Sequence, residues 1–159
     1  MTYKKILIPH DGSGASDRAL ESAIPIAKAT GAQVVLLNVI GEVYIPAGVT
    51  DLGYSKTTGE ELTATTLAKE LHHEMRKDAA IMLDQKKQKY LKEEKNLVIE
   101  SRVVMGYPPD KITEFIREQG IDLVVMGTTG LQGIVKIATI GSVARKVSEA
   151  SSCPVILVH

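Results

Sequence analysis

The sequence predicts an α/β fold in which a parallel β-sheet is covered by helices on both faces. Five short apolar runs alternate with helical patterns along the 159 residues. Nearly every residue in those runs is apolar, which is typical of strands buried on both faces. Because connections between parallel strands are right-handed, the pattern favours a doubly wound sheet.

The first strand and helix occupy the N-terminal part of the chain. The apolar run Ile6–Ile8 ends at Pro9, and the segment Asp11–Gly14 then breaks the pattern. A helix follows and ends at Gly31, with Pro25 predicted to kink it. Its apolar face consists of Ala15, Ala19, Leu20, Ala23, Ile24 and Ala27.

The second strand, Val34–Ile40, is rich in β-branched residues. The stretch Gly41–Gly59 has no clear periodicity, and a connection of this length is expected to be mobile, functional or interrupted by a short element. From about Glu60 to Lys95 the pattern is helical, with an apolar stripe made of Ala64, Leu67, Leu71, Met75, Ala79 and Met82.

The remaining elements continue the alternation, and no internal repeat or linker divides the chain, so we expect a single domain over residues 1–159. The expected elements are a strand at Leu97–Met105, a helix that begins at Pro108-Pro109-Asp110 and stops at Gly120, a strand at Leu123–Met126, a helix at Gly141–Ala150 and a strand at Val155–Val158.

Composition narrows the functional classes. The 19 basic and 19 acidic residues balance, and five Tyr, one Phe and no Trp leave little aromatic surface for stacking bases, so a nucleic-acid partner is not expected. A single cysteine, Cys153, excludes an internal disulfide, and no apolar run reaches membrane-spanning length. We expect a cytoplasmic protein with no membrane partner.

In doubly wound sheets the ligand lies beyond the carboxyl ends of the strands, where the winding reverses. If the reversal falls between the first and fourth strands, two loops face each other there. They are His10–Gly14 and Gly127–Gly133, the two most glycine-rich strand exits in the sequence. We therefore expect the ligand between these loops.

The fourth strand exits into the glycine-rich segment Gly127-Thr128-Thr129-Gly130. Glycine lets the backbone approach a ligand closely, and successive N–H groups in such turns suit phosphate oxygens. Gly141-Ser142 then opens a helix, which adds unpaired N–H donors and a hydroxyl. These glycines could simply form a tight turn and a helix cap, but their convergence at one end of the sheet favours phosphate binding.

Asp11 follows the first strand and has two interpretations. Its carboxylate could contact a ribose or phosphate, or hold a divalent cation through water, and it could equally be a turn former. The pair Gly12-x-Gly14 does not complete a dinucleotide fingerprint, because Asp17 stands at the third glycine position. The sequence contains no Walker A motif, so efficient nucleotide hydrolysis is not expected.

The histidines and the cysteine give no catalytic prediction. His10 lies at the expected crevice but has no partner of suitable type apparent in the sequence, so it is not interpreted as catalytic. His72 and His73 are adjacent on a helix, cannot form an i, i+4 metal pair, and are expected to be exposed. Cys153 is expected to be a small buried residue.

Three segments together resemble the universal stress protein family, and the resemblance covers nearly the whole chain. The N-terminal segment is Ile6-Leu7-Ile8-Pro9-His10-Asp11-Gly12-Ser13. The others are Asp122–Gly127 followed by Gly141-Ser142-Val143-Ala144, and Cys153-Pro154-Val155. The resemblance implies a five-stranded, adenine nucleotide alpha hydrolase-like (Rossmann-like) sheet in the order 3-2-1-4-5. It also implies a role in the stress response and a homodimer formed through Val155–Val158.

The resemblance further implies an ATP site, with Mg²⁺ or Mn²⁺ on the phosphates. Carried over by position, Val35 would lie by the adenine, and Asp11 near the ribose, phosphates and metal. The other implied ligand residues are Pro9, Met126, Gly127, Gly130, Gly141, Ser142 and Val143.

The chain departs from the family motif G-x2-G-x9-G-[ST] at one place, because ten residues rather than nine separate Gly130 from Gly141. One additional residue displaces the chain that follows it by roughly 1.5 Å if it is helical or roughly 3.3 Å if it is extended. Two alternatives to an ATP-binding module with slow or no hydrolysis therefore remain. One is a dimeric interaction protein of this fold without nucleotide, and the other is an adenylate-forming enzyme.

Overall fold

A computed structural model of the chain describes residues 2–44, 59, 63–94, 96–129 and 140–159. Within these ranges it contains one five-stranded parallel sheet with the order β3-β2-β1-β4-β5, as predicted. The winding reverses between β1 and β4, which are neighbours in the sheet. The strands are β1 (Lys5–Pro9), β2 (Gln33–Ile40), β3 (Ile99–Met105), β4 (Leu123–Gly127) and β5 (Val155–Val158).

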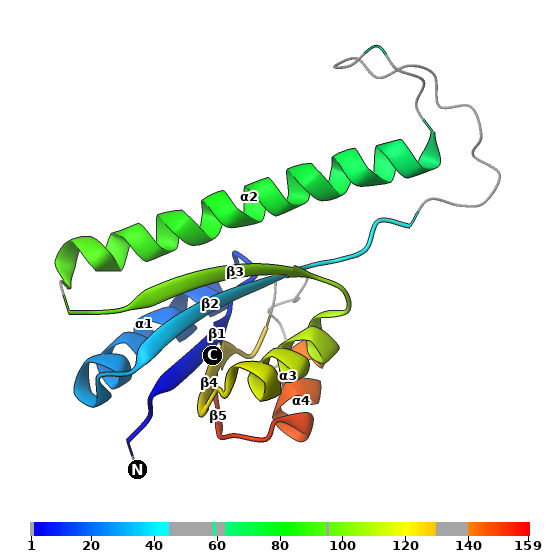
Figure 1. The fold of residues 1–159 in the computed structure, drawn as a ribbon. Coiled ribbons are helices and arrows are strands. Elements are labelled where there is room, and N and C mark those ends of the chain that lie inside the picture. The colour runs from blue at the N-terminus through cyan, green and yellow to red at the C-terminus, as the bar shows by residue number, and fades with distance from the viewer. Residues whose placement is uncertain (1, 45–58, 60–62, 95, 130–139) are drawn as a thin grey trace.

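In the described part of the chain, four helices cover the two faces of the sheet (Figure 1). They are α1 (Gly14–Thr30), α2 (Ala64–Glu93), α3 (Pro108–Gln119) and α4 (Ser142–Ala150). α1 and α2 pack on one face, and α3 and α4 on the other. The long helix α2, green in Figure 1, extends past the end of β3, so only its C-terminal half lies over the sheet.

Alternate residues of each strand enter opposite cores, because side chains in a strand point to the two faces in turn. Ile6 and Ile8 of β1 pack with α1 and α2, whereas Leu7 between them packs with α3 and α4. β2 follows the same rule, with Val34 and Leu36 on the first face. β1, β2 and β4 are buried on both faces, which explains why these three strands are almost entirely apolar, whereas the edge strand β3 is partly exposed and contains Glu100 and Arg102.

The element boundaries differ from the predicted ones by a few residues. α2 begins at Ala64 rather than Glu60 because Thr63 caps it, its hydroxyl accepting a hydrogen bond from the Thr66 N–H. The predicted ends at 60–62 and 95 lie outside the described residues, as do 45–58 of the Gly41–Gly59 connection. β3 begins at Ile99 rather than Leu97. α1 continues through Pro25 without interruption.

The start of α1 is fixed by Ser13, which lies at the N-cap and whose hydroxyl accepts the Ser16 N–H at 3.2 Å. Ser13→Ala is expected to lower the free energy of unfolding by about 1 kcal/mol, because the capping bond is lost. Denaturant titration would measure this. Ser22→Ala, an exposed serine on the same helix, is the matched control and should leave stability nearly unchanged. Equal losses in the two variants would contradict the assigned cap.

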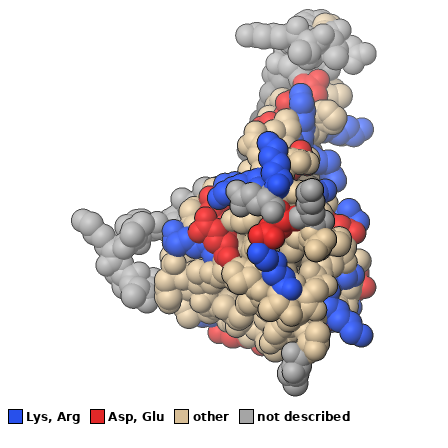
Figure 2. Space-filling model, turned by 90° about the vertical axis from the view of Figure 1, so that its left-hand side faces the viewer, with Lys and Arg blue, Asp and Glu red and all other residues tan. Residues whose placement is uncertain are grey.

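Charged contacts join α1 to α2 along the side where both helices end. Lys28 Nζ lies 2.6 Å from Glu94, just beyond α2, and Lys89 Nζ lies 3.7 Å from Glu21. Figure 2 views the molecule from this side and shows basic and acidic side chains interspersed. Within the described ranges, no helix is both long and apolar enough to cross a membrane.

Candidate functional site

The described parts of the two glycine-rich strand exits lie next to each other at the carboxyl edge of the sheet. Gly127 at the end of β4 lies directly against Ala15 in the first turn of α1. A Cβ on Gly127 would come within 2.7 Å of the Ala15 side chain and 2.8 Å of its main chain. Gly127 is therefore required for the approach of β4 to the loop that follows β1.

The start of α4 is tied to the same turn. The Gly141 N–H donates to the Thr128 carbonyl at 2.6 Å, which places the N-terminus of α4 beside the exit of β4. Among the described residues, the main-chain donors without a helical partner at this helix start therefore belong to Ser142, Val143 and Ala144, and not to Gly141.

Three predicted ligand-site residues belong to one apolar layer. Val35 of β2 and Met126 of β4 are buried, and Val143 of α4 packs against the same cluster. Pro9 ends β1 and pairs in register with Leu37 of β2, so it lies at the edge of this layer. The layer reaches from the middle of the sheet to the start of α4. Val35 and Met126 are only 3% and 4% exposed, so the apolar surface at its edge comes from the half-buried Pro9 and Val143.

The turn after β1 is built around Asp11. Its Oδ1 accepts the Ser13 N–H at 2.9 Å, and Gly12 adopts φ +89°, which favours glycine. Asp11 itself is exposed at the sheet edge. In the described part of the chain, no three His, Cys, Asp or Glu side chains gather as a metal site. A cation at Asp11 would therefore need the phosphates of a ligand as its other oxygen donors.

His10 has the partners that the sequence analysis did not find, so the expectation of an isolated histidine is wrong. Its Nε2 lies 3.1 Å from Asp17 Oδ1, and its Nδ1 lies 3.3 Å from Ser16 Oγ and accepts the Gly12 N–H at 3.2 Å. Lys86 of α2 binds the same Asp17 oxygen at 2.6 Å. The imidazole is buried, and Ser16 is 3% exposed, so this cluster positions the turn rather than presenting a nucleophile to a substrate.

Burial lowers the pKa of His10 below its ordinary value of 6.5, an effect that Asp17 opposes and Lys86 reinforces. Burial alone would raise the pKa of Asp17, but Lys86 and His10 hold that pKa below its ordinary value. Near neutral pH the imidazole of His10 is therefore neutral and the carboxylate of Asp17 is ionised.

This lowered pKa predicts a pH dependence of stability. Below pH 6.5 the unfolded chain takes up a proton at His10 more readily than the folded chain does. The free energy of unfolding therefore decreases as the pH is lowered from 6.5 to the pKa of His10 in the folded protein. Denaturant titrations between pH 7.5 and pH 5 would measure the fall, which His10→Asn should reduce. His73→Asn, at an exposed histidine, is the control and should keep the wild-type pH dependence.

One feature of the site was missed by sequence reasoning. The buried Thr128 donates its N–H to the Val158 carbonyl, and its hydroxyl lies 3.2 Å from His159 Nδ1. Arg18 Nε of α1 also donates to the His159 carbonyl at 2.6 Å. These contacts could not be predicted from the sequence, because they form only when β4 and β5 are paired. Gly130, a predicted ligand residue, lies outside the described residues.

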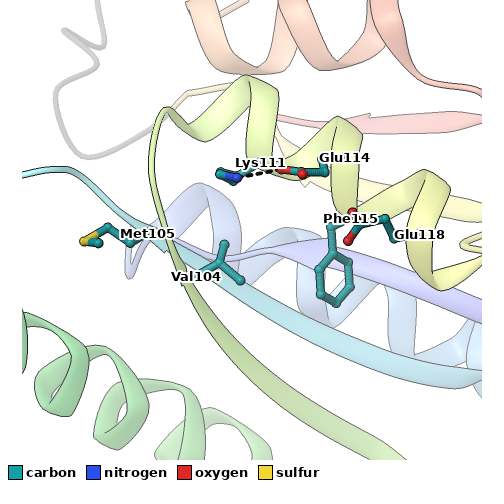
Figure 3. Close-up of a pocket in the computed structure, with 6 residues that line it drawn as sticks. All are labelled: Val104, Met105, Lys111, Glu114, Phe115 and Glu118. Atoms are coloured by element: carbon teal, nitrogen blue, oxygen red, sulfur yellow. Dashed lines mark hydrogen bonds and ion pairs between the residues drawn. The ribbon is translucent and has the colours of Figure 1, made fainter.

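Two hollows lie apart from the exits of β1 and β4, and no residue of those exits lines them. One, of about 170 Å³, lies between the end of β3 and α3 (Figure 3). Phe115 points from α3 towards β3, while Lys111 is paired with Glu114 at 2.7 Å. Glu118 also lines this hollow, and its negative charge together with that of Glu114 would repel a phosphate. A second hollow, of about 290 Å³ between α3 and α4, is lined by Asp110 and Glu149 with Lys146.

His72, His73 and Cys153 lie away from the site. His73 is exposed as expected. His72 is half-buried rather than exposed, because its Nε2 accepts the Val43 N–H at 2.8 Å where α2 passes the end of β2. Cys153 is half-buried rather than buried, and its N–H donates to Ser151 Oγ just before β5.

The chain is similar to known proteins over nearly its whole length. The sequence profile described as "Universal stress protein family" matches residues 2–159. Universal stress protein YxiE of Bacillus subtilis is 31% identical over 157 residues, 99% of either chain. Universal stress protein MJ0531 of Methanocaldococcus jannaschii is 36% identical over 156 residues, 98% of this chain and 82% of the relative.

Solved structures of universal stress proteins have a fold similar to that of this chain. Universal stress protein UspA from Lactobacillus plantarum has a TM-score of 0.82 at 23% identity, covering 100% of this chain and 99% of its own. A universal stress protein in complex with cAMP has a TM-score of 0.59 at 25% identity, covering 100% and 98%. One from Archaeoglobus fulgidus in complex with dAMP has a TM-score of 0.55 at 20% identity and covers 100% of both chains. Some proteins of this fold thus bind adenine nucleotides.

Proposed function

Because the chain belongs to the universal stress protein family, we propose that it is a cytoplasmic stress-response and signalling module that binds ATP between the exits of β1 and β4. The observation that carries the proposal is the meeting of three parts at one edge of the sheet. These are the Asp11 turn, the Gly127 turn and the start of α4. The cAMP complex of a 25% identical protein supports an adenine nucleotide as the ligand class.

Each part of the edge has a role in this proposal. The half-buried Pro9 and Val143 provide apolar contact for the adenine ring, and the buried Val35 and Met126 pack behind them. Asp11 accepts hydrogen bonds from ribose hydroxyls. The phosphates lie at the start of α4, where the Ser142 and Val143 amides, the Ser142 hydroxyl and the positive end of the helix dipole favour an anion. The Gly127–Gly130 turn completes the phosphate end.

The proposed chemistry is binding with slow or no hydrolysis. Mg²⁺ or Mn²⁺ would bind mainly to the phosphates, with Asp11 as a water-mediated partner, because one carboxylate alone holds such ions weakly. No Walker-type lysine is present in the sequence to stabilise charge on a transferred phosphoryl group.

The proposal includes a homodimer formed through β5. β5 is the outermost strand next to β4, and Ile156 on it is 39% exposed. An edge strand with exposed main-chain groups can pair with a second copy. Analytical ultracentrifugation would test the assembly, and a monomer at tens of micromolar would argue against it.

Isothermal titration calorimetry with ATP, with and without Mg²⁺, tests the proposed ligand directly. Saturable binding of one ATP per chain is expected, with weaker binding of GTP, whose ring carries different edge groups. The absence of saturable binding by any of ATP, AMP and cAMP would reject the nucleotide proposal.

A second candidate is an interaction protein of the same fold that has lost its nucleotide. Two observations favour it: the Gly141 N–H is used within the protein, and the spacer before Gly141 is one residue longer than in the family motif. Mass spectrometry of small molecules released from freshly purified, denatured protein decides between the two. A stoichiometric adenine nucleotide would exclude the second candidate.

A further inference from the structure

We propose that the outer edge of β3 is a surface for self-association, on which β3 pairs antiparallel with β3 of a second copy of this chain, with Ser101 opposite Ser101. This edge lies at the other end of the sheet from β5, so the contact is separate from the homodimer proposed above. It requires neither that homodimer nor a bound nucleotide.

The pairing of β3 with β2 determines which main-chain groups of β3 face outwards. The Val98 carbonyl accepts the Val34 N–H at 2.8 Å, and the Gly106 N–H donates to the Ile40 carbonyl at 3.0 Å. Because successive residues of a strand direct their main-chain groups to opposite sides, the even-numbered residues of β3 bond β2. The odd-numbered residues from 99 to 105 therefore direct their N–H and C=O groups to the outer edge.

This outer edge is open to another strand. Within the described residues, the N–H groups of those odd-numbered positions have no hydrogen-bond partner. The Ser101 carbonyl is contacted by Arg102 and the Val103 carbonyl by Arg76 of α2, each at 3.4 Å, which is longer than the usual N–H···O distance of about 2.7–3.2 Å. α2 contacts β2 as well as β3, so it covers a face of β3 and not its edge. An edge strand in this state can pair with another strand.

The charges on β3 favour a second copy as the partner strand. Glu100 and Arg102 point to the same face of the sheet, where they pair with each other at 3.0 Å. In an antiparallel pair centred on Ser101, Glu100 of each copy lies opposite Arg102 of the other. Opposite charges directly across two strands attract each other, and like charges repel. In this register the sequence of β3 is therefore complementary to itself.

The neighbouring registers lack this complementarity. Outward-facing residues must lie opposite one another to exchange hydrogen bonds, so the next registers are centred on Glu100 or Arg102. These would place two carboxylates or two guanidinium groups opposite each other. The register centred on Ser101 also covers Val98, which is 58% exposed just before β3, by placing it opposite the half-buried Val104 of the other copy.

Disulfide formation in the full chain tests the register. In a Cys153→Ser background, Ser101→Cys would place the Cα atoms of the two cysteines about 5.5 Å apart, a distance that a disulfide spans. Met105→Cys is the matched control, because Met105 lies on the same edge and face but would be roughly 27 Å from its counterpart. Under mild oxidation at tens of micromolar, we expect a covalent dimer only from Ser101→Cys. Equal crosslinking of the two variants, or none in either, would overturn the pairing.

Charge reversal tests the complementarity by analytical ultracentrifugation. Glu100→Arg and Arg102→Glu should each weaken self-association by about tenfold, because each places like charges opposite each other at two points of the pair. An equimolar mixture of the two variants should restore association, since one chain then carries two positive charges and the other two negative ones. Wild-type association in either variant alone, or no recovery in the mixture, would contradict the proposal. Neither experiment contains ATP, and assembly through β5 alone leaves Ser101→Cys unlinked, so failure of the proposed function does not affect the result.

Discussion

Ser142→Glu is expected to weaken ATP binding by at least about tenfold without destabilising the protein. Ser142 is exposed at the first position of α4, where a carboxylate favours the helix dipole and costs the fold nothing. The same carboxylate would lie where the phosphates are proposed to bind. Two like charges about 4 Å apart repel by about 4 kcal/mol at the dielectric constant typical of a protein surface. Because Ser142 is exposed, salt and water screen this repulsion, and the expected loss of ATP affinity is the smaller, tenfold one.

Ser152→Glu is the matched control, because it makes the same change at an exposed serine just beyond the other end of α4. The helix from Ser142 to Ala150 alone is roughly 12 Å long, so Ser152 lies far from the start of α4. Calorimetry should give wild-type affinity for Ser152→Glu. Unchanged affinity in Ser142→Glu, with wild-type unfolding behaviour, would mean that phosphates do not bind at the start of α4.

Gly127→Val is expected to lower the free energy of unfolding by about 3 kcal/mol or more. Its Cβ alone would lie 2.7 to 2.9 Å from three atoms of Ala15, two of them main-chain atoms that cannot rotate away. Relief requires α1 to move away from β4, and overpacking of this kind typically costs about 1–3 kcal/mol even for smaller additions. Denaturant titration would measure the loss.

Gly41→Ala is the control for the glycine substitution. A Cβ on Gly41 would meet nothing within 4 Å, and its backbone does not require glycine, so stability should stay the same or rise slightly. If Gly127→Val were as stable as wild type, the close approach of β4 to α1 would not exist as described. Since this approach also brings the two glycine loops together, ATP binding should be lost along with stability.

The fold could be predicted from the sequence because both faces of the sheet are buried. Continuous apolar runs such as Val34–Ile40, separated by helices ending at Gly31 and Gly120, leave few arrangements other than a doubly wound parallel sheet. Element ends were less predictable, since the start of α2 depends on the cap formed by Thr63 and not on the apolar stripe.

The site was predictable only in part. The position of the two strand exits follows from the sheet order, so Asp11 and Gly127 could be named in advance. The role of Gly127 in helix packing could not, because it depends on Ala15 across the sheet edge. The pairing of His10 with Asp17 and Lys86 likewise needs α1 and α2 in place. The use of the Gly141 N–H by Thr128 is a three-dimensional contact that the motif does not encode.

An NMR titration of the ¹⁵N-labelled protein with ATP tests the central claim most directly, because it reports both binding and location. We predict saturable shifts of the amides at 11–13, 127–129 and 142–144, and little change at Lys111 and Glu118 beside the hollow between β3 and α3. No saturable shift, or shifts centred on that hollow, would contradict a nucleotide site between the exits of β1 and β4.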